Sequence, residues 1–218
     1  MKTLHIRVML VDDHAIVLEG YRRLLEKQDG FEVVAEAQDS VAAYRHCKEL
    51  QPDVAVIDIS MPGRGGIDLC RQLRQRDPSA RIVVFTMHQG AAFARQAFQA
   101  GAKAYVTKSS PPMLLVTAIR EAFAGRTFIS PDVSEELART SVEANSSALS
   151  SLSPREFEIL RLLLETKSVS EIAAALNISP KTVINNHYLI KQKLAVATDI
   201  ELLYLGLRER VVDPPRPD

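Results

Sequence analysis

Short apolar segments alternate with segments of helical periodicity through the first half of the chain. Five apolar segments are rich in β-branched residues, and each is followed by a stretch whose apolar positions recur at helical spacing. Short buried strands that alternate with helices are typical of a parallel sheet, because parallel strands need crossover connections. The pattern predicts a doubly wound α/β domain with a five-stranded parallel sheet. The predicted strands are Ile6–Val11, Phe31–Ala35, Val54–Ile57, Ile82–Phe85 and Ala104–Val106, and the predicted helices are Ala15–Glu26, Val41–Leu50, Ile67–Arg76, Ala91–Gln99 and Met113–Ala124.

The last third of the chain has helical periodicity alone, and capping residues mark where its helices begin. Ser153, Ser168 and Thr198 are each followed three residues later by Glu, which is the spacing of a capping box. Ser179 precedes Pro180, a cap residue followed by proline at the first helical position. The signals predict a small all-α domain of four helices, at about 154–165, 169–176, 180–194 and 199–208. Two residues separate the second helix from the third, which predicts a helix-turn-helix motif at about 170–189.

The segment between these two regions shows neither a strand signal nor a strong apolar face. It is rich in Ser, Thr and Ala, and Pro131–Arg139 could form a short helix within it. We interpret residues 125–148 as a linker between a domain at 4–124 and a domain at 149–212. The tail, 213–218, contains three prolines and is expected to be frayed.

Composition narrows the class of protein. The chain has 218 residues, of which 46% are hydrophobic and 25% charged, as in globular proteins generally. No apolar run approaches the roughly 20 residues that span a bilayer, and the apolar stretch Val8–Val11 is too short for a secretory signal. We therefore expect a cytoplasmic protein with no membrane attachment. Cys47 and Cys70 fall in helical patterns and are expected to be packed thiols.

Charge alone gives no argument for nucleic-acid binding. The formal net charge of the chain is zero, with 27 basic and 27 acidic residues, and residues 149–212 carry 8 basic and 7 acidic residues. A strongly basic domain would point to nucleic acid, and this domain is not one. Any DNA-binding function must therefore depend on the local arrangement of side chains.

Polar residues stand where the predicted strands end. Asp12 and Asp13 end the first strand, Asp58 the third and Thr86 the fourth, and Lys108 lies two residues beyond the fifth. Ligands of open parallel sheets bind at this edge. Three neighbouring carboxylates repel one another unless a cation is present, and Mg²⁺ prefers such oxygen ligands. A carboxylate can also act as a covalent phosphoryl acceptor, whose new charge the lysine and threonine could then contact.

Each of these residues also has a simpler interpretation. The Asp pair could cap a helix, Asp58 could be a loop acid, and Thr86 could be an ordinary β-branched strand end. Lys108 could be solvated, and Tyr105 in the last strand could be a core aromatic. Their joint placement at the ends of four strands favours a site at which one aspartate becomes phosphorylated.

The motifs around these residues resemble those of a known family. Residues 4–124 are similar to the response-regulator receiver domain, which has a flavodoxin-like fold, and residues 149–212 resemble the LuxR-type DNA-binding domain. Together they resemble two-component response regulators of the NarL/FixJ type. The receiver-like motifs are Val11-Asp12-Asp13-His14, Asp58-Ile59-Ser60-Met61-Pro62-Gly63 with Gly66, Thr86, and Gly101-Ala102 through Tyr105 to Lys108. The LuxR-like motifs are Leu152-Ser153-Pro154-Arg155-Glu156, Glu171-Ile172-Ala173, Leu176 through Val183, and Lys193-Leu194.

The resemblance implies a role for each residue of the strand-end site. Asp58 would accept a phosphoryl group from a sensor histidine kinase. Mg²⁺ would be bound by Asp13 with support from Asp12, and by Asp58 and the carbonyl of Ser60. Thr86 and Tyr105 would be the switch pair, and Lys108 would contact the phosphoryl group. Met87 stands where the family often has a small residue, and its bulk could slow access to the phosphoryl group.

The third predicted helix of the second domain has two distinct faces. Val183, His187, Ile190 and Leu194 form a stripe that we expect to be buried. The opposite face suits the major groove, because Asn and Gln can bond adenine and Ile can contact a thymine methyl. The predicted DNA contacts are Lys181, Thr182, Ile184, Asn185, Tyr188 and Gln192, with Lys191 and Lys193 at phosphates. Ile184 and Asn186 depart from the family's common residues, so the target sequence does not follow from relatives.

These expectations combine into one functional hypothesis. The resemblance implies a homodimer when the protein is phosphorylated, bound to double-stranded DNA at an inverted repeat to regulate transcription. The candidate dimer contacts are Ile200, Leu203, Tyr204 and Leu207 in the last helix, although core packing of that stripe remains an alternative. The protein would not be an enzyme, beyond possible self-dephosphorylation. The alternative hypotheses are a phosphotransfer module whose helical domain binds protein or RNA, and a receiver switched without phosphate.

Overall fold

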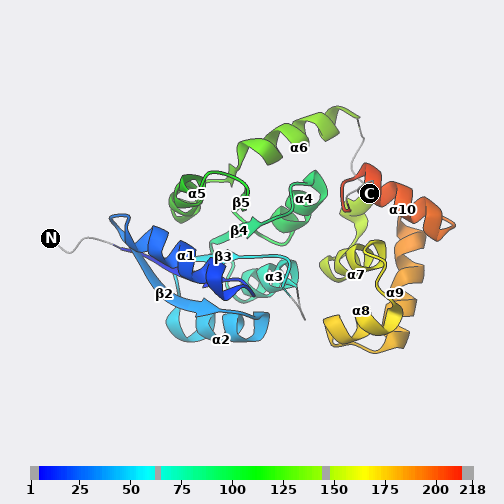
Figure 1. The fold of residues 1–218 in the computed structure, drawn as a ribbon, viewed down its shortest axis with the longest axis horizontal. Helices are drawn as coiled ribbons and strands as arrows, with labels where there is room; N and C mark the ends of the chain where they lie inside the picture. The colour runs from blue at the N-terminus through cyan, green and yellow to red at the C-terminus, as the bar shows by residue number, and fades with distance from the viewer. Residues whose placement is uncertain (1–4, 62–64, 144–147, 213–218) are drawn as a thin grey trace.

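The computed structural model describes residues 5–61, 65–143 and 148–212, and it contains one parallel sheet followed by a helical domain. The sheet order is β2-β1-β3-β4-β5-β6, and every strand pair is parallel (Figure 1). The chain order reverses between β1 and β3, which places their carboxyl ends at the crevice where ligands of such sheets bind. The strands are β1 (Ile6–Val11), β2 (Phe31–Ala37), β3 (Val54–Ile57), β4 (Ile82–Thr86), β5 (Ala104–Thr107) and β6 (Phe128–Ile129).

Five helices cover the two faces of the sheet, as the alternating pattern predicts. One apolar cluster joins a face of the sheet to α1 and α5, and a second joins the other face to α2, α3 and α4. The central strands are apolar on both sides, because both faces are covered. The helices are α1 (Ala15–Glu26), α2 (Ser40–Leu50), α3 (Gly66–Arg76), α4 (Ala91–Gln99) and α5 (Met113–Phe123).

The segment interpreted as a linker contains more structure than its sequence indicates. The two residues of β6 pair with β5 and extend the predicted five-stranded sheet to six strands. Helix α6 (Pro131–Glu143) follows, and it is longer than the short helix considered for Pro131–Arg139. Its beginning is held by Asp132, whose carboxylate accepts a hydrogen bond of 2.6 Å from the Thr107 hydroxyl on β5. Both features depend on contacts with β5, which is distant in sequence, so local periodicity does not reveal them. The predicted frayed tail, 213–218, lies outside the described residues.

The four predicted helices of the second domain are all present. They are α7 (Pro154–Leu164), α8 (Val169–Leu176), α9 (Pro180–Lys193) and α10 (Asp199–Arg208), preceded by the 3₁₀ turn η1 (Ala148–Ser151). Ser153, Ser168 and Thr198 each form a complete capping box with the glutamate three residues later. The turn between α8 and α9 passes through Asn177, whose φ of 51° is in the left-handed region that asparagine tolerates. Helices α8 and α9 therefore form the predicted helix-turn-helix unit.

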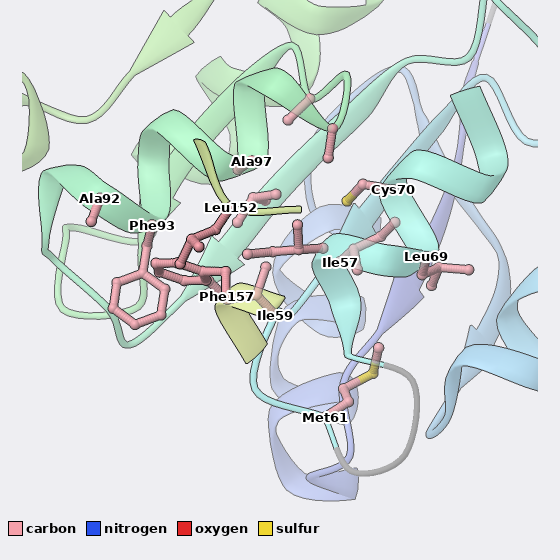
Figure 2. Packing of buried hydrophobic residues seen from close by; sticks show 14 of the residues in the cluster. Ile57, Ile59, Met61, Leu69, Cys70, Ala92, Phe93, Ala97, Leu152 and Phe157 are labelled. Carbon is pink, nitrogen blue, oxygen red and sulfur yellow. The ribbon is translucent and has the colours of Figure 1, made fainter. Parts of the chain in front are cut away.

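The helical domain packs directly on the α3–α4 side of the α/β domain (Figure 1). The Phe93 ring on α4 meets the Phe157 ring on α7 edge to face, with 5.1 Å between centroids. Gln96 on α4 is buried, and its amide donates to the carbonyls of Leu149 and Leu152 at 2.8 and 3.2 Å. Figure 2 shows Phe93, Phe157 and Leu152 in the same apolar cluster as Ile57 and Ile59, which lie next to Asp58 in sequence.

Among the helices of the described residues, none is both long enough and apolar enough to cross a membrane.

The two cysteine thiols are expected to react slowly in the native protein. Burial raises the pKa of Cys47 to about 11 and that of Cys70 to about 12, so little reactive thiolate is present at neutral pH. We expect negligible alkylation by iodoacetamide at pH 7.5 in buffer and alkylation of both thiols in denaturing urea. Intact-protein mass spectrometry measures both. Rapid alkylation of Cys70 without denaturant would contradict the packing described above.

Candidate functional site

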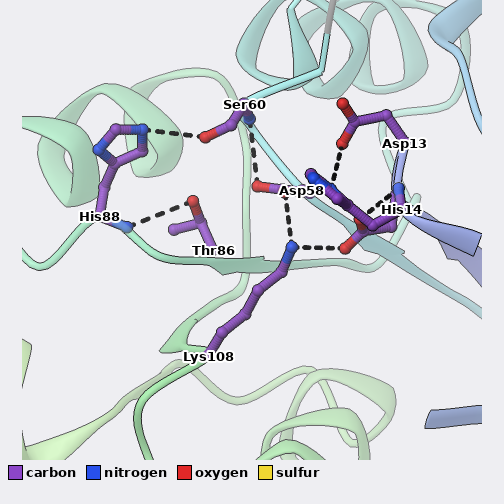
Figure 3. Close-up of polar contacts among 8 residues, drawn as sticks. Asp13, His14, Asp58, Ser60, Thr86, His88 and Lys108 are labelled. Atoms are coloured by element: carbon purple, nitrogen blue, oxygen red, sulfur yellow. Dashed lines mark hydrogen bonds and ion pairs between the residues drawn. The ribbon is translucent and has the colours of Figure 1, made fainter. Parts of the chain in front are cut away.

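Buried carboxylates and a lysine converge at the carboxyl edge of the sheet (Figure 3). Asp12 and Asp58 are 4% and 3% exposed, and they follow the neighbouring strands β1 and β3. The Lys108 ammonium lies between them, 2.5 Å from an Asp12 oxygen and 2.7 Å from Asp58 Oδ2. Asp58 Oδ1 also accepts a hydrogen bond of 3.1 Å from the Ser60 amide. The sheet thus brings together the strand-end residues that the sequence predicted.

The charge of Lys108 is fixed by its two partners. Burial lowers the pKa of Lys108, but its hydrogen bonds to Asp12 and Asp58 outweigh burial and raise the pKa above its ordinary value. Lys108 therefore stays protonated at neutral pH. A permanent ammonium beside Asp58 can pair with negative charge that develops on that carboxylate.

Asp13 adds a third carboxylate on the solvent side of this cluster. Its side chain is 27% exposed, and His14 Nδ1 lies 2.9 Å from Asp13 Oδ1. Ligand atoms of Asp12, Asp13 and His14 fall within 4.8 Å of one another. Three carboxylates and one lysine ammonium leave an excess of negative charge at this edge of the sheet, and most of the potential ligand atoms are oxygens. The donor set therefore fits Mg²⁺, a hard cation that prefers oxygen ligands.

A glycine lets the loop after Asp58 fold closely around this site. A Cβ atom at Gly66 would lie 2.0 Å from the Asp58 carbonyl oxygen, closer than any side chain permits. Helix α3 begins at this glycine, so any larger residue would push the start of α3 away from Asp58. Gly66 belongs to the receiver-like motif, and the structure gives a steric reason for its presence.

The predicted switch residues are buried beside the site, and they meet a residue that the sequence analysis missed. Thr86 and Tyr105 are both 0% exposed. The Thr86 hydroxyl accepts a long hydrogen bond of 3.4 Å from the His88 amide, and the Tyr105 hydroxyl donates to the His88 carbonyl at 2.9 Å. Burial raises the pKa of Tyr105 well above 10, so the hydroxyl keeps its proton and remains a donor. The sequence feature that could have pointed to His88 is its position two residues beyond the end of β4, at the same edge of the sheet as the other site residues.

The faces of α9 agree with the helical pattern of its sequence, except that His187 of the predicted buried stripe is only half-buried. Val183 and Ile190 are fully buried and Leu194 nearly so, whereas Ile184 and Tyr188 are 56% and 62% exposed. We call the exposed side the reading face. Its residues are Lys181, Thr182, Ile184, Asn185, Tyr188 and Gln192, all of them exposed. Gln192 donates to the Tyr188 hydroxyl at 2.9 Å, which orders two neighbouring side chains of this face.

Two of the predicted phosphate-contacting lysines are already paired with acids. Lys193 lies 2.6 Å from Glu156, the capping glutamate of α7, and Lys191 lies 3.0 Å from Asp199. Asp199 also contacts His187 at 2.9 Å, so this histidine bonds to the start of α10. Lys181, by contrast, has no ion-pair partner among the described residues. It could therefore contact a phosphate without first breaking an ion pair.

Helix α10 leaves most of its predicted dimer stripe uncovered. Ile200, Leu203 and Tyr204 are 68%, 42% and 69% exposed, and Leu207 is half-buried. The opposite side packs on α7, where a Cβ atom at Gly206 would lie 2.4 Å from Leu164. The core of the domain is therefore packed mainly by the other side of α10, and of the candidate dimer contacts Ile200, Leu203 and Tyr204 are exposed while Leu207 is partly covered.

A parallel sheet with an Asp–Lys–Thr site at its carboxyl edge, joined to a helix-turn-helix domain, defines a class of phosphorylation-controlled DNA-binding regulators. Residues 8–120 match the response regulator receiver domain, and residues 150–205 match the bacterial regulatory proteins of the luxR family. The chain belongs to the two-component response regulators that join these two domains, the NarL/FixJ type. A helical domain that binds protein or RNA instead is not favoured by these matches.

Several characterised relatives align over nearly the whole chain. Response regulator GacA of Pseudomonas viridiflava is 38% identical over 210 residues, which are 95% of this chain and 98% of that protein. Response regulator UvrY of Escherichia coli K12 is 36% identical over 205 residues, 93% of this chain and 94% of that protein.

Solved structures of response regulators match this chain over one or both of its domains. RcsB of Salmonella enterica serovar Typhimurium, bound to promoter rprA with the phosphomimetic BeF₃⁻, matches with a TM-score of 0.70 at 33% identity, over 92% of this chain and 98% of that one. A LuxR-family response regulator from Aurantimonas sp. SI85-9A1 is 56% identical, with a TM-score of 0.62, and covers 63% of this chain and 99% of that one.

Proposed function

We propose that Asp58 accepts a phosphoryl group from the phosphohistidine of a sensor histidine kinase. The observation that carries this proposal is the buried Asp58 carboxylate, held 2.7 Å from the Lys108 ammonium at the carboxyl edge of the sheet. An Asp58 oxygen attacks phosphorus and forms the new P–O bond, while the P–N bond breaks and the kinase imidazole keeps its electron pair. Lys108 then pairs with the phosphoryl oxygens, and the Thr86 hydroxyl donates a hydrogen bond to another of them.

Mg²⁺, when bound, neutralises phosphoryl charge during the transfer. Asp13 and Asp58 would hold the ion directly, together with the carbonyl of Ser60, and Asp12 would support it. The excess of carboxylate charge over the single Lys108 ammonium supports this assignment. Lys108 bridges Asp12 and Asp58, and its positive charge offsets part of the repulsion between them.

We further propose that residues 4–124 act as the receiver domain and residues 149–212 as the DNA-binding domain of a phosphorylation-dependent homodimer. The exposed Ile200, Leu203 and Tyr204 supply an apolar stripe for a second copy. RcsB has been solved as dimers bound to DNA, which supports this assembly. Two helix-turn-helix units related by a two-fold axis would read an inverted repeat, with half-sites about one helical turn apart.

A single titration tests the proposed function. Beryllofluoride with Mg²⁺ should raise the dimer fraction and the DNA affinity of the full chain together, each by about tenfold, a typical allosteric coupling. Thr86→Ala should take up beryllofluoride but respond less, because the lost hydroxyl is the group that would turn toward the phosphoryl position. Sedimentation velocity measures dimerisation, and fluorescence anisotropy on an inverted-repeat duplex measures affinity. Unchanged sedimentation and unchanged affinity after beryllofluoride uptake would contradict this model.

A further inference from the structure

We propose that His88 is a positioning residue that couples the phosphoacceptor site to the docking of the helical domain. The inference rests on the proposed function of Asp58 and concerns how phosphorylation would reach the second domain. His88 lies in the loop between β4 and α4, and it contacts residues of the site on one side and α4 on the other. His88 therefore connects the phosphoacceptor site with helix α4.

Three different segments of the site hold His88 in place, and Figure 3 shows the contacts from two of them, Ser60 and Thr86. The Ser60 hydroxyl lies 2.9 Å from Nε2 of the imidazole, and Ser60 is two residues from Asp58. The backbone of His88 donates to the Thr86 hydroxyl at 3.4 Å and accepts from the Tyr105 hydroxyl at 2.9 Å. His88 is thus bonded to the loop after Asp58 and to both residues of the switch pair.

Aromatic contacts continue from His88 into the helical domain. The imidazole stacks on the Phe93 ring, with 3.9 Å between centroids and an angle of 11° between planes. Phe93 then meets Phe157 on α7 edge to face at 5.1 Å. Both phenylalanines are nearly or fully buried, so neither ring can move without repacking its neighbours. Three rings therefore connect the loop after β4 with the first helix of the helical domain, and Figure 2 shows the last two of them, Phe93 and Phe157.

Two further contacts define the docked position of the helical domain. Gln96, one turn beyond Phe93 on α4, donates to the carbonyls of Leu149 and Leu152, while its buried Oε1 accepts no hydrogen bond within the described structure. Gly65, in the loop after Asp58, lies so near α7 that a Cβ there would be 3.2 Å from the Glu158 carboxyl carbon. The docked domain therefore contacts α4, which packs on His88 through Phe93, and the loop after Asp58, which holds His88 through Ser60. The unpaired Gln96 oxygen lowers the stability of this docked form.

Phosphorylation would disturb His88 at two of its bonds. If the Thr86 hydroxyl turns to a phosphoryl oxygen, its contact with the His88 amide is lost. Ser60 lies two residues after Asp58, and its amide donates to Asp58 Oδ1, so modification of that carboxylate would also shift the Ser60 hydroxyl relative to the imidazole. The stacked ring then moves Phe93 against Phe157, and docking weakens. The reading face is already exposed in the docked form. Release of the helical domain would therefore change the orientation of α9 relative to the receiver, and it would not uncover the reading face.

Hydrogen exchange of the full chain measures this release directly. In the wild type, beryllofluoride with Mg²⁺ should accelerate amide exchange in residues 148–157 by about tenfold, because η1 and the start of α7 lose their cover. His88→Phe keeps an aromatic ring on Phe93 but loses the hydrogen bond to Ser60, and His88→Gln keeps a polar group but loses the ring stack. Both variants should take up beryllofluoride. His88→Gln should show less than a twofold change in this segment, and His88→Phe, which keeps the ring stack and the backbone contact with Thr86, should respond less than the wild type. A wild-type response in either variant would overturn the proposal.

A matched pair on α4 tests the docked position itself. Gln96→Glu places a carboxylate against two carbonyl oxygens, so residues 148–157 should exchange rapidly without beryllofluoride. Gln99→Glu makes the same change at an exposed position of α4 and should exchange as the wild type does. Slow exchange in Gln96→Glu would overturn the docked arrangement.

These measurements separate failure of the coupling from failure of the proposed function. If the wild type takes up no beryllofluoride, the Asp58 assignment fails. If the wild type takes it up and exchange in residues 148–157 stays unchanged, the coupling alone fails.

Discussion

Asp58→Asn should abolish covalent phosphorylation of this chain. An amide of the same shape cannot form the acyl phosphate, so labelling by acetyl phosphate or by a kinase should fall below detection. The substitution removes the acceptor and keeps the packing, because Asp58 is buried between β3 and Lys108. Phosphate-affinity gel electrophoresis in the presence of Mg²⁺ measures the phosphorylated fraction.

A matched control separates this effect from general loss of structure. Asp29→Asn makes the same chemical change at an exposed turn, away from the carboxyl edge of the sheet, and should label as the wild type does. Chelation of Mg²⁺ should remove labelling from the wild type and from this control alike. Persistent labelling of Asp58→Asn under native conditions would move the acceptor to another carboxylate, and Asp13, the partly exposed carboxylate of the cluster, would be tested next.

Asn185→Ala should weaken binding to the specific DNA site by about 1–3 kcal/mol and relax base preference at one position. Asn185 lies on the exposed reading face, and its amide can bond an adenine edge through both of its polar atoms. Random DNA of the same length should be bound almost as before, because non-specific affinity comes from phosphate contacts.

Lys181→Ala is the comparison that separates base reading from phosphate binding. Lys181 has no ion-pair partner among the described residues, so its ammonium is available to DNA. This substitution should weaken all sequences equally and reduce the slope of log affinity against log salt by about one. Lys193→Ala should have a smaller effect, because its ammonium already pairs with Glu156 at 2.6 Å. If Asn185→Ala weakened specific and random DNA equally, the assignment of the reading face would be wrong.

The elements that the sequence predicted well are those whose ends are set by local chemistry. Helix α10 begins one residue after Thr198, because the Thr198–Glu201 capping box satisfies the first amides of the helix. Strand β6 was missed because two residues carry no periodicity, and its pairing with β5 supplies all of its order. Helix α6 was underestimated for the same reason, since Asp132 is fixed by Thr107 on a distant strand.

The residues of the candidate site also fall into two groups: those that the order of strands places, and those that only tertiary packing places. The convergence of Asp12, Asp58 and Lys108 follows from parallel strands alone, because their carboxyl ends share one edge of the sheet. His88 was not predicted, because its importance comes from the approach of Ser60 and Phe93, which no local pattern encodes. The pairing of Lys193 with Glu156 was hidden for the same reason: the two residues are brought together by packing of α9 on α7.

The hydrogen bonds of Gln96 have a consequence for how such chains can be recombined. Its amide binds main-chain carbonyls of Leu149 and Leu152, and every amino acid offers the same carbonyl. The edge-to-face contact of Phe93 with Phe157, by contrast, requires a particular side chain on α7. A foreign output module grafted after this receiver would therefore meet the demand of Gln96 with any sequence, but it would need an aromatic residue at the position of Phe157 and apolar residues around it to dock.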